Sequence, residues 1–323
     1  MSDDGLDAFD GETLDLIVPG ALDEIRIDRV LALLTGLSRS EANEIIASGA
    51  VRLNDKVIVK SSTPVLDGQR LVAVLPAPES TDVEADASVP VDVVVDDADF
   101  AVVNKAPGQV VHPGAGHRHG TLVSGLLALY PQMRLLSEEG LCDPLRPGIV
   151  HRLDKGTSGV LVVAKTPEGF TNLSTQLAER LMERTYYGMV EGHVTEERGV
   201  VDAPIGRSTR TPTVMAVRSD GRAARTGYEV IARIEKPHAM SLLRLQLDTG
   251  RTHQIRVHLA SIGHPVVNDP RYGHRREKRL AEDRFFLHST TLAFAHPRTD
   301  EWLTTSVPLP ADLAALVPAS VEF

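Results

Sequence analysis

The pattern of apolar and polar positions predicts a small unit of two helices followed by strands near the start of the chain. Apolar residues at helical spacing mark a first helix from Ile27. A second helix begins after a capping box formed by Ser38 and Glu41 and stops at Gly49. Short strand-like segments separated by turn residues then run to Leu75, which predicts a hairpin and a last strand.

A longer segment from residue 92 to the end has the mixed pattern of an α+β domain. Helices are predicted at 120–129 and from Pro167 onward, and residues 249–258 are predicted to be a strand-to-helix junction that ends at Gly263. Strands are predicted at 93–95, 100–103, 159–164, 184–194, 214–217, 228–234 and 242–247, with the last three forming an antiparallel meander. The two units are separated by 76–91, a stretch of Pro, Ala, Ser and acids without periodicity that predicts a linker.

The remaining segment, 1–24, predicts a flexible acidic tail, so the expected division is 1–24, 25–75, 76–91 and 92–323. Charge sharpens this division. The chain has a net charge of -10, but residues 1–24 and 76–100 contain eight acids each and no Lys or Arg. The rest keeps 28 of the 44 acids against all 34 Lys and Arg, so the folded body is mildly basic and can bind RNA.

Composition excludes several classes of protein. No apolar run approaches the ~20 residues that span a bilayer, and a single cysteine, Cys142, fits a reducing cytoplasm. The phosphate-binding, dinucleotide-binding and zinc-protease motifs are absent, which argues against most nucleotide-dependent enzymes and against zinc proteases. We expect no metal site, and we interpret three histidines as loop residues: His112, His117 and His119.

The stretch 146–166 carries the strongest candidate chemistry. Asp154 lies in a loop with cations on both sides, directly before a buried strand. A guanidinium nearby favours the ionised carboxylate, which can act as a nucleophile or base without a metal. Tyr186, on a following strand, can stack on a planar substrate and move a proton. Arg251, at a glycine turn, can pair with Asp154 or with a phosphate.

The first unit, with RIDRVLALL, SRSEANEIIASGAVRLNDKVI and LDGQRLVAV, resembles the S4 RNA-binding domain. That resemblance implies that basic residues of the second helix and the following hairpin face RNA. By position these residues form a basic triplet: Arg39, Arg52 and Lys56.

The second unit resembles the RluA/RluD-type pseudouridine synthases through HRLDKGTSGVLVVAKT, RTYYGMVEG, LDTGRTHQIRVHLASIGHP and FLHSTTLAFAHP. The resemblance implies cofactor-free isomerisation of uridine in RNA on a mixed, mainly antiparallel sheet flanked by helices. It implies that Asp154 is catalytic, that Tyr186 contacts the uracil and removes the C5 proton, and that Arg251 pairs with Asp154. Arg152 would fill the space left by the flipped uridine, and we expect His151 and Lys105 to contribute to substrate binding.

The S4 unit and the forms VVHPGAG and RPGIVHRLDK are most similar to the RluD-like branch. This implies a monomeric cytoplasmic enzyme acting on a stem-loop of large-subunit ribosomal RNA, free or in a pre-ribosomal particle. Two positions depart from the family pattern: Gly156, where many members have an acid, and Asn268, where a glycine is usual. Asp154 could attack C1′, attack C6 of the uracil, or remove the C2′ proton, and the sequence does not choose among these steps.

Two other classes of function compete with this interpretation. One is a non-catalytic RNA chaperone or ribosome-assembly factor that keeps the fold. The other is a glycosidase-like hydrolase with Asp154 as nucleophile, which requires a second carboxyl group as acid. Asp248 and Asp269 are candidates for that acid by location in the sequence.

Overall fold

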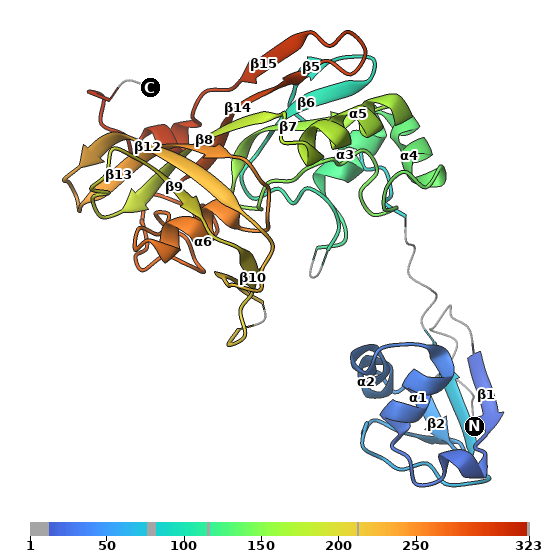
Figure 1. Ribbon diagram of the computed structural model, residues 1–323. Helices are drawn as coiled ribbons and strands as arrows, with labels where there is room; N and C mark the ends of the chain where they lie inside the picture. Colours follow the sequence, from blue (N-terminus) through green and yellow to red (C-terminus); the bar gives the residue numbers. More distant parts are fainter. Residues whose placement is uncertain (1–12, 76–81, 115–116, 212, 322–323) are drawn as a thin grey trace. The chain divides into compact units, whose positions relative to one another are not determined.

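The computed structural model describes residues 13–75, 82–114, 117–211 and 213–321. The chain divides into two compact units, Met1–Thr81 and Asp82–Phe323, each with its own core (Figure 1). No helix in these ranges is both long and apolar enough to cross a membrane.

The N-terminal unit packs two helices on a four-stranded antiparallel sheet. Its elements are β1 (Thr13–Ile17), the 3-10 turn η1 (Gly20–Leu22), α1 (Ile27–Thr35), α2 (Arg39–Ala47), β2 (Val51–Leu53), β3 (Lys56–Val57) and β4 (Arg70–Val74). The strand order is β1-β4-β2-β3. The predicted capping box is present, since Ser38 accepts from the Glu41 amide and Glu41 accepts from the Ser38 amide.

The expected flexible tail is wrong for residues 13–24. Strand β1 pairs with β4 along its whole length, and Val18 and Leu22 are buried in the unit's core. The alternation of Leu14 and Leu16 with acids in this stretch is a half-buried strand pattern, which the high acid content concealed. The first half of the expected tail, residues 1–12, lies outside the described residues.

The C-terminal unit is built on one nine-stranded sheet. Its strands are β5 (Val93–Asp96), β6 (Phe100–Lys105), β7 (Ser158–Ala164), β8 (Glu183–Glu191), β9 (Arg198–Asp202), β12 (Arg225–Ile234), β13 (Met240–Leu247), β14 (Leu287–Ala295) and β15 (Trp302–Ser306). The order is β5-β6-β7-β14-β8-β13-β12-β9, with β15 paired to β14. Only β7 and β14 run parallel, so the sheet is mixed and mainly antiparallel, as expected.

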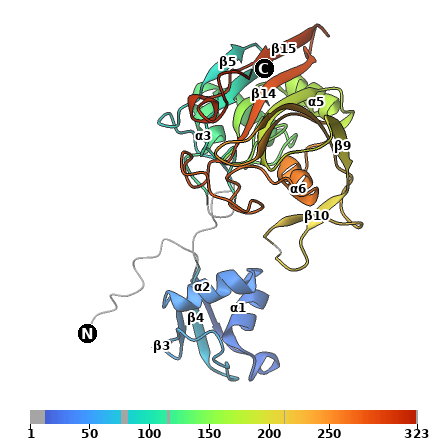
Figure 2. The same cartoon turned by 90° about the vertical axis from the view of Figure 1, so that its left-hand side faces the viewer.

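Helices cover both faces of the sheet. They are α3 (Leu122–Leu129), η2 (Pro131–Arg134), α4 (Leu135–Glu138), α5 (Pro167–Ala178), α6 (Gln254–Ser261) and α7 (Ala311–Ala314). Because strand side chains alternate, β6 places Ala101 and Val103 in the core with α3, and Phe100 and Val102 in the core with α5. Burial on both faces explains why β7 is a continuous apolar run. Figure 2 shows α6 near β9, at the other end of the sheet, and near β10 (Ile205–Arg207).

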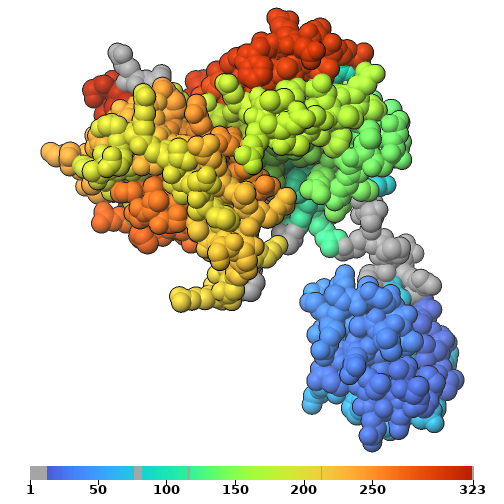
Figure 3. All heavy atoms as spheres, viewed as in Figure 1, coloured from blue at the N-terminus to red at the C-terminus, as the bar shows by residue number. Residues whose placement is uncertain are grey.

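Strand β14 is inserted at the centre of the sheet although it comes late in the chain. Its close approach to β7 requires a glycine, since a Cβ on Gly159 would lie 2.0 Å from the Ser289 carbonyl oxygen. Gln176 of α5 donates to the Ala295 carbonyl oxygen at 2.8 Å, which ties the helix to the end of β14. In Figure 3 the red residues of the C-terminal strands lie against the yellow-green segment that contains α5.

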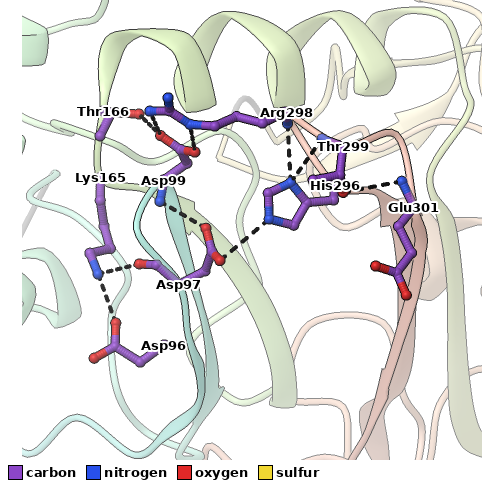
Figure 4. A network of polar contacts seen from close by, with 9 residues as sticks. All are labelled: Asp96, Asp97, Asp99, Lys165, Thr166, His296, Arg298, Thr299 and Glu301. Atoms are coloured by element: carbon purple, nitrogen blue, oxygen red, sulfur yellow. Dashed lines mark hydrogen bonds and ion pairs between the residues drawn. The ribbon is translucent and has the colours of Figure 1, made fainter.

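Polar contacts fasten the hairpin β5–β6 to the turn that joins β14 to β15 (Figure 4). Asp99, buried between them, binds the Arg298 guanidinium and accepts from the Thr166 hydroxyl at 2.8 Å. Lys165 donates to an Asp96 carboxylate oxygen at 2.7 Å and lies 4.4 Å from the centre of the Tyr130 ring. These contacts hold the edge of the sheet that carries β5.

Two further expectations about the larger unit need correction. Residues 82–91 are not a linker: Val83 is buried in the main core, and a Cβ on Gly125 of α3 would lie 2.8 Å from the Val89 carbonyl oxygen. Residues 76–81 lie outside the described ranges. The predicted three-strand meander is also wrong in its first strand, because β11 (Met215–Val217) pairs with β10 (Ile205–Arg207) in a separate two-stranded sheet.

Candidate active site

A cleft of about 390 Å³ opens beside the loop before β7, a size suited to one nucleotide. Segments far apart in the sequence line it, including the loop 149–154, β8 and the junction between β13 and α6. Five of its lining residues are arginines and one is acidic: Arg146, Arg152, Arg184, Arg251, Arg256 and Asp154. This imbalance favours an anionic ligand.

Asp154 is held in the cleft by an arginine that the sequence analysis did not select. Nη1 of Arg256 donates to Oδ2 of Asp154 at 2.8 Å, and the carboxylate keeps 17% of its surface exposed. Arg256 also forms a bidentate pair with Asp269, through Nε at 2.6 Å and Nη2 at 2.9 Å. The two carboxylates raise the pKa of Arg256 above its already high value despite burial, so the guanidinium is a fixed cation.

The expected pair between Arg251 and Asp154 is therefore corrected. Arg251 lines the cleft, but its Nε donates to the Ala223 carbonyl oxygen at 3.1 Å. The physical reason is the backbone turn at His253, which has φ 56° in the left-handed region and starts α6 immediately afterwards. The turn leaves Arg251 before the helix and places Arg256, on the buried side of the helix, next to Asp154.

Tyr186 lines the cleft from β8 and is 4% exposed. Burial raises the pKa of its hydroxyl, and the nearby Arg184 guanidinium and a hydrogen bond with Ser289 offset part of that rise. The hydroxyl is therefore protonated at neutral pH. The structure thus brings Tyr186 and Asp154 together in one cleft, as expected.

His151 and Arg152 also line the cleft. Nε2 of His151 accepts the Val162 amide at 3.0 Å, and burial lowers the pKa of the ring to about 3, so it is neutral. This contact anchors the Asp154 loop to β7. Arg152 is exposed, and its Nη1 lies 3.1 Å from Nε2 of His112, which leaves most of the guanidinium open to solvent.

Lys105 does not reach the cleft. It is 1% exposed, and its ammonium donates to three backbone carbonyl oxygens, those of Ala106, Gln109 and Lys155. Burial lowers its pKa to about 7, whereas three acceptors favour the charged form with three donors. Its contact with the Lys155 carbonyl oxygen ties it to the loop that carries Asp154.

The two departures from the family pattern have structural reasons. A Cβ on Gly156 would lie 2.3 Å from the Asp283 carbonyl oxygen and 2.5 Å from the Phe285 ring, so an acid does not fit there. Asn268 has φ 62°, a conformation that asparagine tolerates better than most residues. Its side chain also donates to the Arg284 carbonyl oxygen at 2.6 Å, a contact that glycine cannot make.

The carboxyl groups considered for a hydrolase are both engaged elsewhere. Asp269 is fully buried and bound by Arg256, and Asp248 pairs with Arg225 at 3.0 Å. Neither lines the cleft, and Asp154 is the one acidic residue among the described residues that line it, whereas glycoside hydrolysis uses two carboxyl groups.

In the N-terminal unit, the basic triplet lies on the second helix and the following hairpin. Arg39 begins α2 and is mostly exposed, with one nitrogen 3.3 Å from the buried Asp28. The Arg26 and Arg39 guanidiniums lower the pKa of Asp28 to about 2, the larger effect coming from Arg26. Arg52 and Lys56 lie on the adjacent strands β2 and β3.

This combination, a cationic cleft around one anchored aspartate in one unit and a basic module in the other, is that of an RNA-modifying enzyme. A sequence model for RNA pseudouridylate synthases matches residues 99–261, and one for the S4 domain matches residues 25–71. The chain belongs to the RNA pseudouridine synthase family, and it is an isomerase that acts on RNA.

Similar proteins cover nearly the whole chain. An uncharacterized RNA pseudouridine synthase of Chloroflexus aurantiacus is 44% identical over 97% of this chain and 96% of its own. Ribosomal large subunit pseudouridine synthase D of Haemophilus influenzae is 39% identical over 91% of this chain and 90% of its own. The structure of human RNA pseudouridylate synthase domain containing 1 is 28% identical, with a TM-score of 0.53 over 70% of this chain and 86% of that one.

Proposed function

We propose that the enzyme isomerises uridine to pseudouridine in a stem-loop of large-subunit ribosomal RNA, free or in a pre-ribosomal particle. The observation that carries the proposal is the cleft in which the buried Arg256 holds Asp154 among four further arginines. Similarity to relatives named ribosomal large subunit pseudouridine synthase D supports the choice of RNA. We further propose that the enzyme is a monomer. Because ribosomal RNA is in the cytoplasm, the proposed substrate would place the enzyme there.

The reaction requires the target base to leave its stack, since the bond from N1 to C1′ is replaced by one from C5 to C1′. Asp154 is the proposed catalytic group. Its carboxylate is oriented by Arg256 and still 17% exposed, so it is both fixed and accessible to a flipped nucleotide. All three first steps, at C1′, at C6 and at the C2′ proton, are open to a carboxylate in this position.

Tyr186 is the proposed contact for the uracil ring and the base for the C5 proton. Because its pKa is raised, little phenolate is present at neutral pH, and the phenolate that forms is a strong base. Arg152, exposed at the mouth of the cleft, is the proposed side chain that occupies the vacated stem, with Arg251 available for a phosphate. His151 and Lys105 support the loop that carries Asp154.

The basic triplet is the proposed RNA contact of the S4 unit. Its three side chains come from adjacent elements, α2, β2 and β3. The Nε of Arg52 is buried and has no hydrogen-bond partner among the described residues, so no acidic group there neutralises it through this atom.

The test is tritium release from C5-labelled uridine in large-subunit ribosomal RNA, with wild type and Asp154→Asn side by side. Release by the wild type alone supports the reaction on this RNA and the role of the carboxylate. Retained RNA binding by the inactive Asp154→Asn variant would separate catalysis from binding. Equal activity of both proteins would contradict the role of Asp154, and no release from ribosomal RNA by either would contradict the proposed substrate.

A further inference from the structure

Arg184 is a cleft residue with no part in the chemistry described so far. It lies on β8 two residues before Tyr186, so both side chains are on the same face of the strand. Both line the cleft that contains Asp154. Arg184 is 6% exposed, so its charge is almost completely withdrawn from water.

Among the residues that the structure describes, the guanidinium of Arg184 has no acidic partner. Three arginines in the described ranges are more than nine-tenths buried, and the other two bind carboxylates, Arg256 those of Asp154 and Asp269, and Arg284 that of Asp312. Arg184 instead donates from Nη2 to the Leu247 carbonyl oxygen, at 3.2 Å. Its Nε is buried with no partner in the described part of the chain.

Burying a cation without a counterion costs free energy, because the charge loses its hydration. The presence of such a cation in a cleft therefore indicates that a ligand supplies the missing hydrogen-bond acceptors. The ligand should be anionic and should reach the inner wall. Phosphates of a flipped nucleotide remain attached to the RNA backbone and face the mouth, where Arg152 is exposed and Arg146 is half-exposed. The part of the nucleotide that enters furthest is the base.

The reaction itself makes the base anionic. When the C1′–N1 bond breaks, its electron pair stays on the uracil and spreads over N1, O2 and O4. C5 then bonds to C1′, the C5 proton is removed, and N1 takes up a proton, so that the product ring is neutral and no proton is gained or lost overall. If Asp154 instead adds first at C6, the displaced electron pair moves toward O4, so every open route places negative charge on the ring oxygens.

We propose that Arg184 is a further catalytic residue, whose free N–H groups donate to a carbonyl oxygen of the flipped uracil and stabilise the negative charge of the detached base. This inference rests on the proposed function and names the inner subsite of the same cleft. The planar fork of a guanidinium suits a delocalised anion. Arg184 also lies close enough to lower the pKa values of Tyr186 and His151, which places its field across the cleft.

The experiment measures single-turnover tritium release and RNA dissociation constants for wild type, Arg184→Met and Arg184→Lys. We expect Arg184→Met to slow the chemical step by about 10²- to 10³-fold, as for loss of one anion-stabilising donor. RNA affinity should change by less than about threefold, and lysine should restore part of the rate. Arg198→Met, which removes an arginine that is 78% exposed and outside the cleft, serves as the matched control and should retain the wild-type rate.

A purely structural role is separated by chemical rescue. Arg184→Ala should gain at least about tenfold in rate when guanidinium chloride is added at millimolar concentration, and Arg198→Met should gain nothing. A rate within about threefold of wild type for Arg184→Met, a loss confined to affinity, or absence of rescue in folded Arg184→Ala would each overturn the proposal. If Arg184→Met does not fold, the rate of Arg184→Lys and the rescue of Arg184→Ala by guanidinium test the proposal in its place.

Failure of the proposed function would give a different result, because the wild-type enzyme itself would then release no tritium from large-subunit ribosomal RNA. The same comparison of variants would be made on transfer RNA, the next substrate to be tried. Arg184 is judged by the ratio of variant to wild type on whichever RNA is modified.

Discussion

Replacing Arg256 by methionine should be among the most destabilising single changes near the cleft. The guanidinium is 5% exposed and binds two carboxylates, of which Asp269 is fully buried. Removing one partner of a buried ion pair typically costs 3–5 kcal/mol because the remaining charge is left without compensation. Two backbone amides, those of Arg271 and Tyr272, also donate to Asp269 and soften the loss. We therefore expect about 3 kcal/mol.

For a unit of this size, about 3 kcal/mol corresponds to a fall in Tm of roughly 6–12 °C. Trp302 is the single tryptophan of the chain and lies in the C-terminal unit, so its fluorescence reports the unfolding of that unit alone. The double variant Arg256→Met/Asp269→Asn removes both charges and should recover about 1–2 kcal/mol of the lost stability. It should recover no activity, since Asp154 still lacks its partner.

Arg251→Met is the matched control, because this arginine lines the same cleft but has no carboxylate partner among the residues described. We expect it to lower the free energy of unfolding by less than about 1 kcal/mol. Equal destabilisation by the two single variants would refute the assignment of the ion pair to Arg256. A double variant no more stable than Arg256→Met would refute the explanation by an uncompensated buried charge.

Three other predictions test separate parts of the structure. Replacing the basic triplet by alanine should lower the slope of log K against log salt by about 2–3 if each side chain contacts a phosphate, and an unchanged slope would assign RNA to another face. Gly156→Asp should cost about 1–3 kcal/mol in thermal unfolding, because its Cβ meets the Asp283 carbonyl oxygen, whereas Gly114→Ala, in open space, should be neutral. With its pKa raised above 10, Tyr186 is less than about 1% phenolate at pH 8, so the rate should rise nearly tenfold per pH unit between pH 7 and 9; a flat profile would exclude phenolate as the base.

Local features of the fold could be predicted where a short stretch contains the whole physical cause. The capping box at Ser38, the glycine stop of α2 and the buried strand β7 depend on neighbouring residues alone, and all three are present. The position of β14 could not be predicted in this way. It lies between β7 and β8 although about a hundred residues separate it from either one, and the pairing depends on a backbone approach at Gly159.

The candidate site shows the same limit at the level of single side chains. Arg251 and Arg256 stand five residues apart in one motif, and either can pair with a carboxylate by chemistry alone. The choice is made by the left-handed turn at His253 and by the direction of α6, which depend on packing against the rest of the unit. Arg184 was missed because an arginine on a strand is usually a solvated residue, and its lack of a counterion is visible only in three dimensions.

The net charge of the chain does not predict which ligands its cleft binds. At physiological ionic strength the Debye length is about 8 Å, so exposed charges further away than that are largely screened. An anionic ligand in the cleft is therefore governed by the five arginines and one aspartate that line it, and not by the chain's total of -10. Within the cleft, burial weakens the screening and makes each pairing decisive. Arg256 is neutralised by two carboxylates and fixes Asp154, whereas Arg184 keeps its charge for a ligand. The different roles of Arg256 and Arg184 follow from the positions of the acidic residues, and not from the number of acidic residues in the chain.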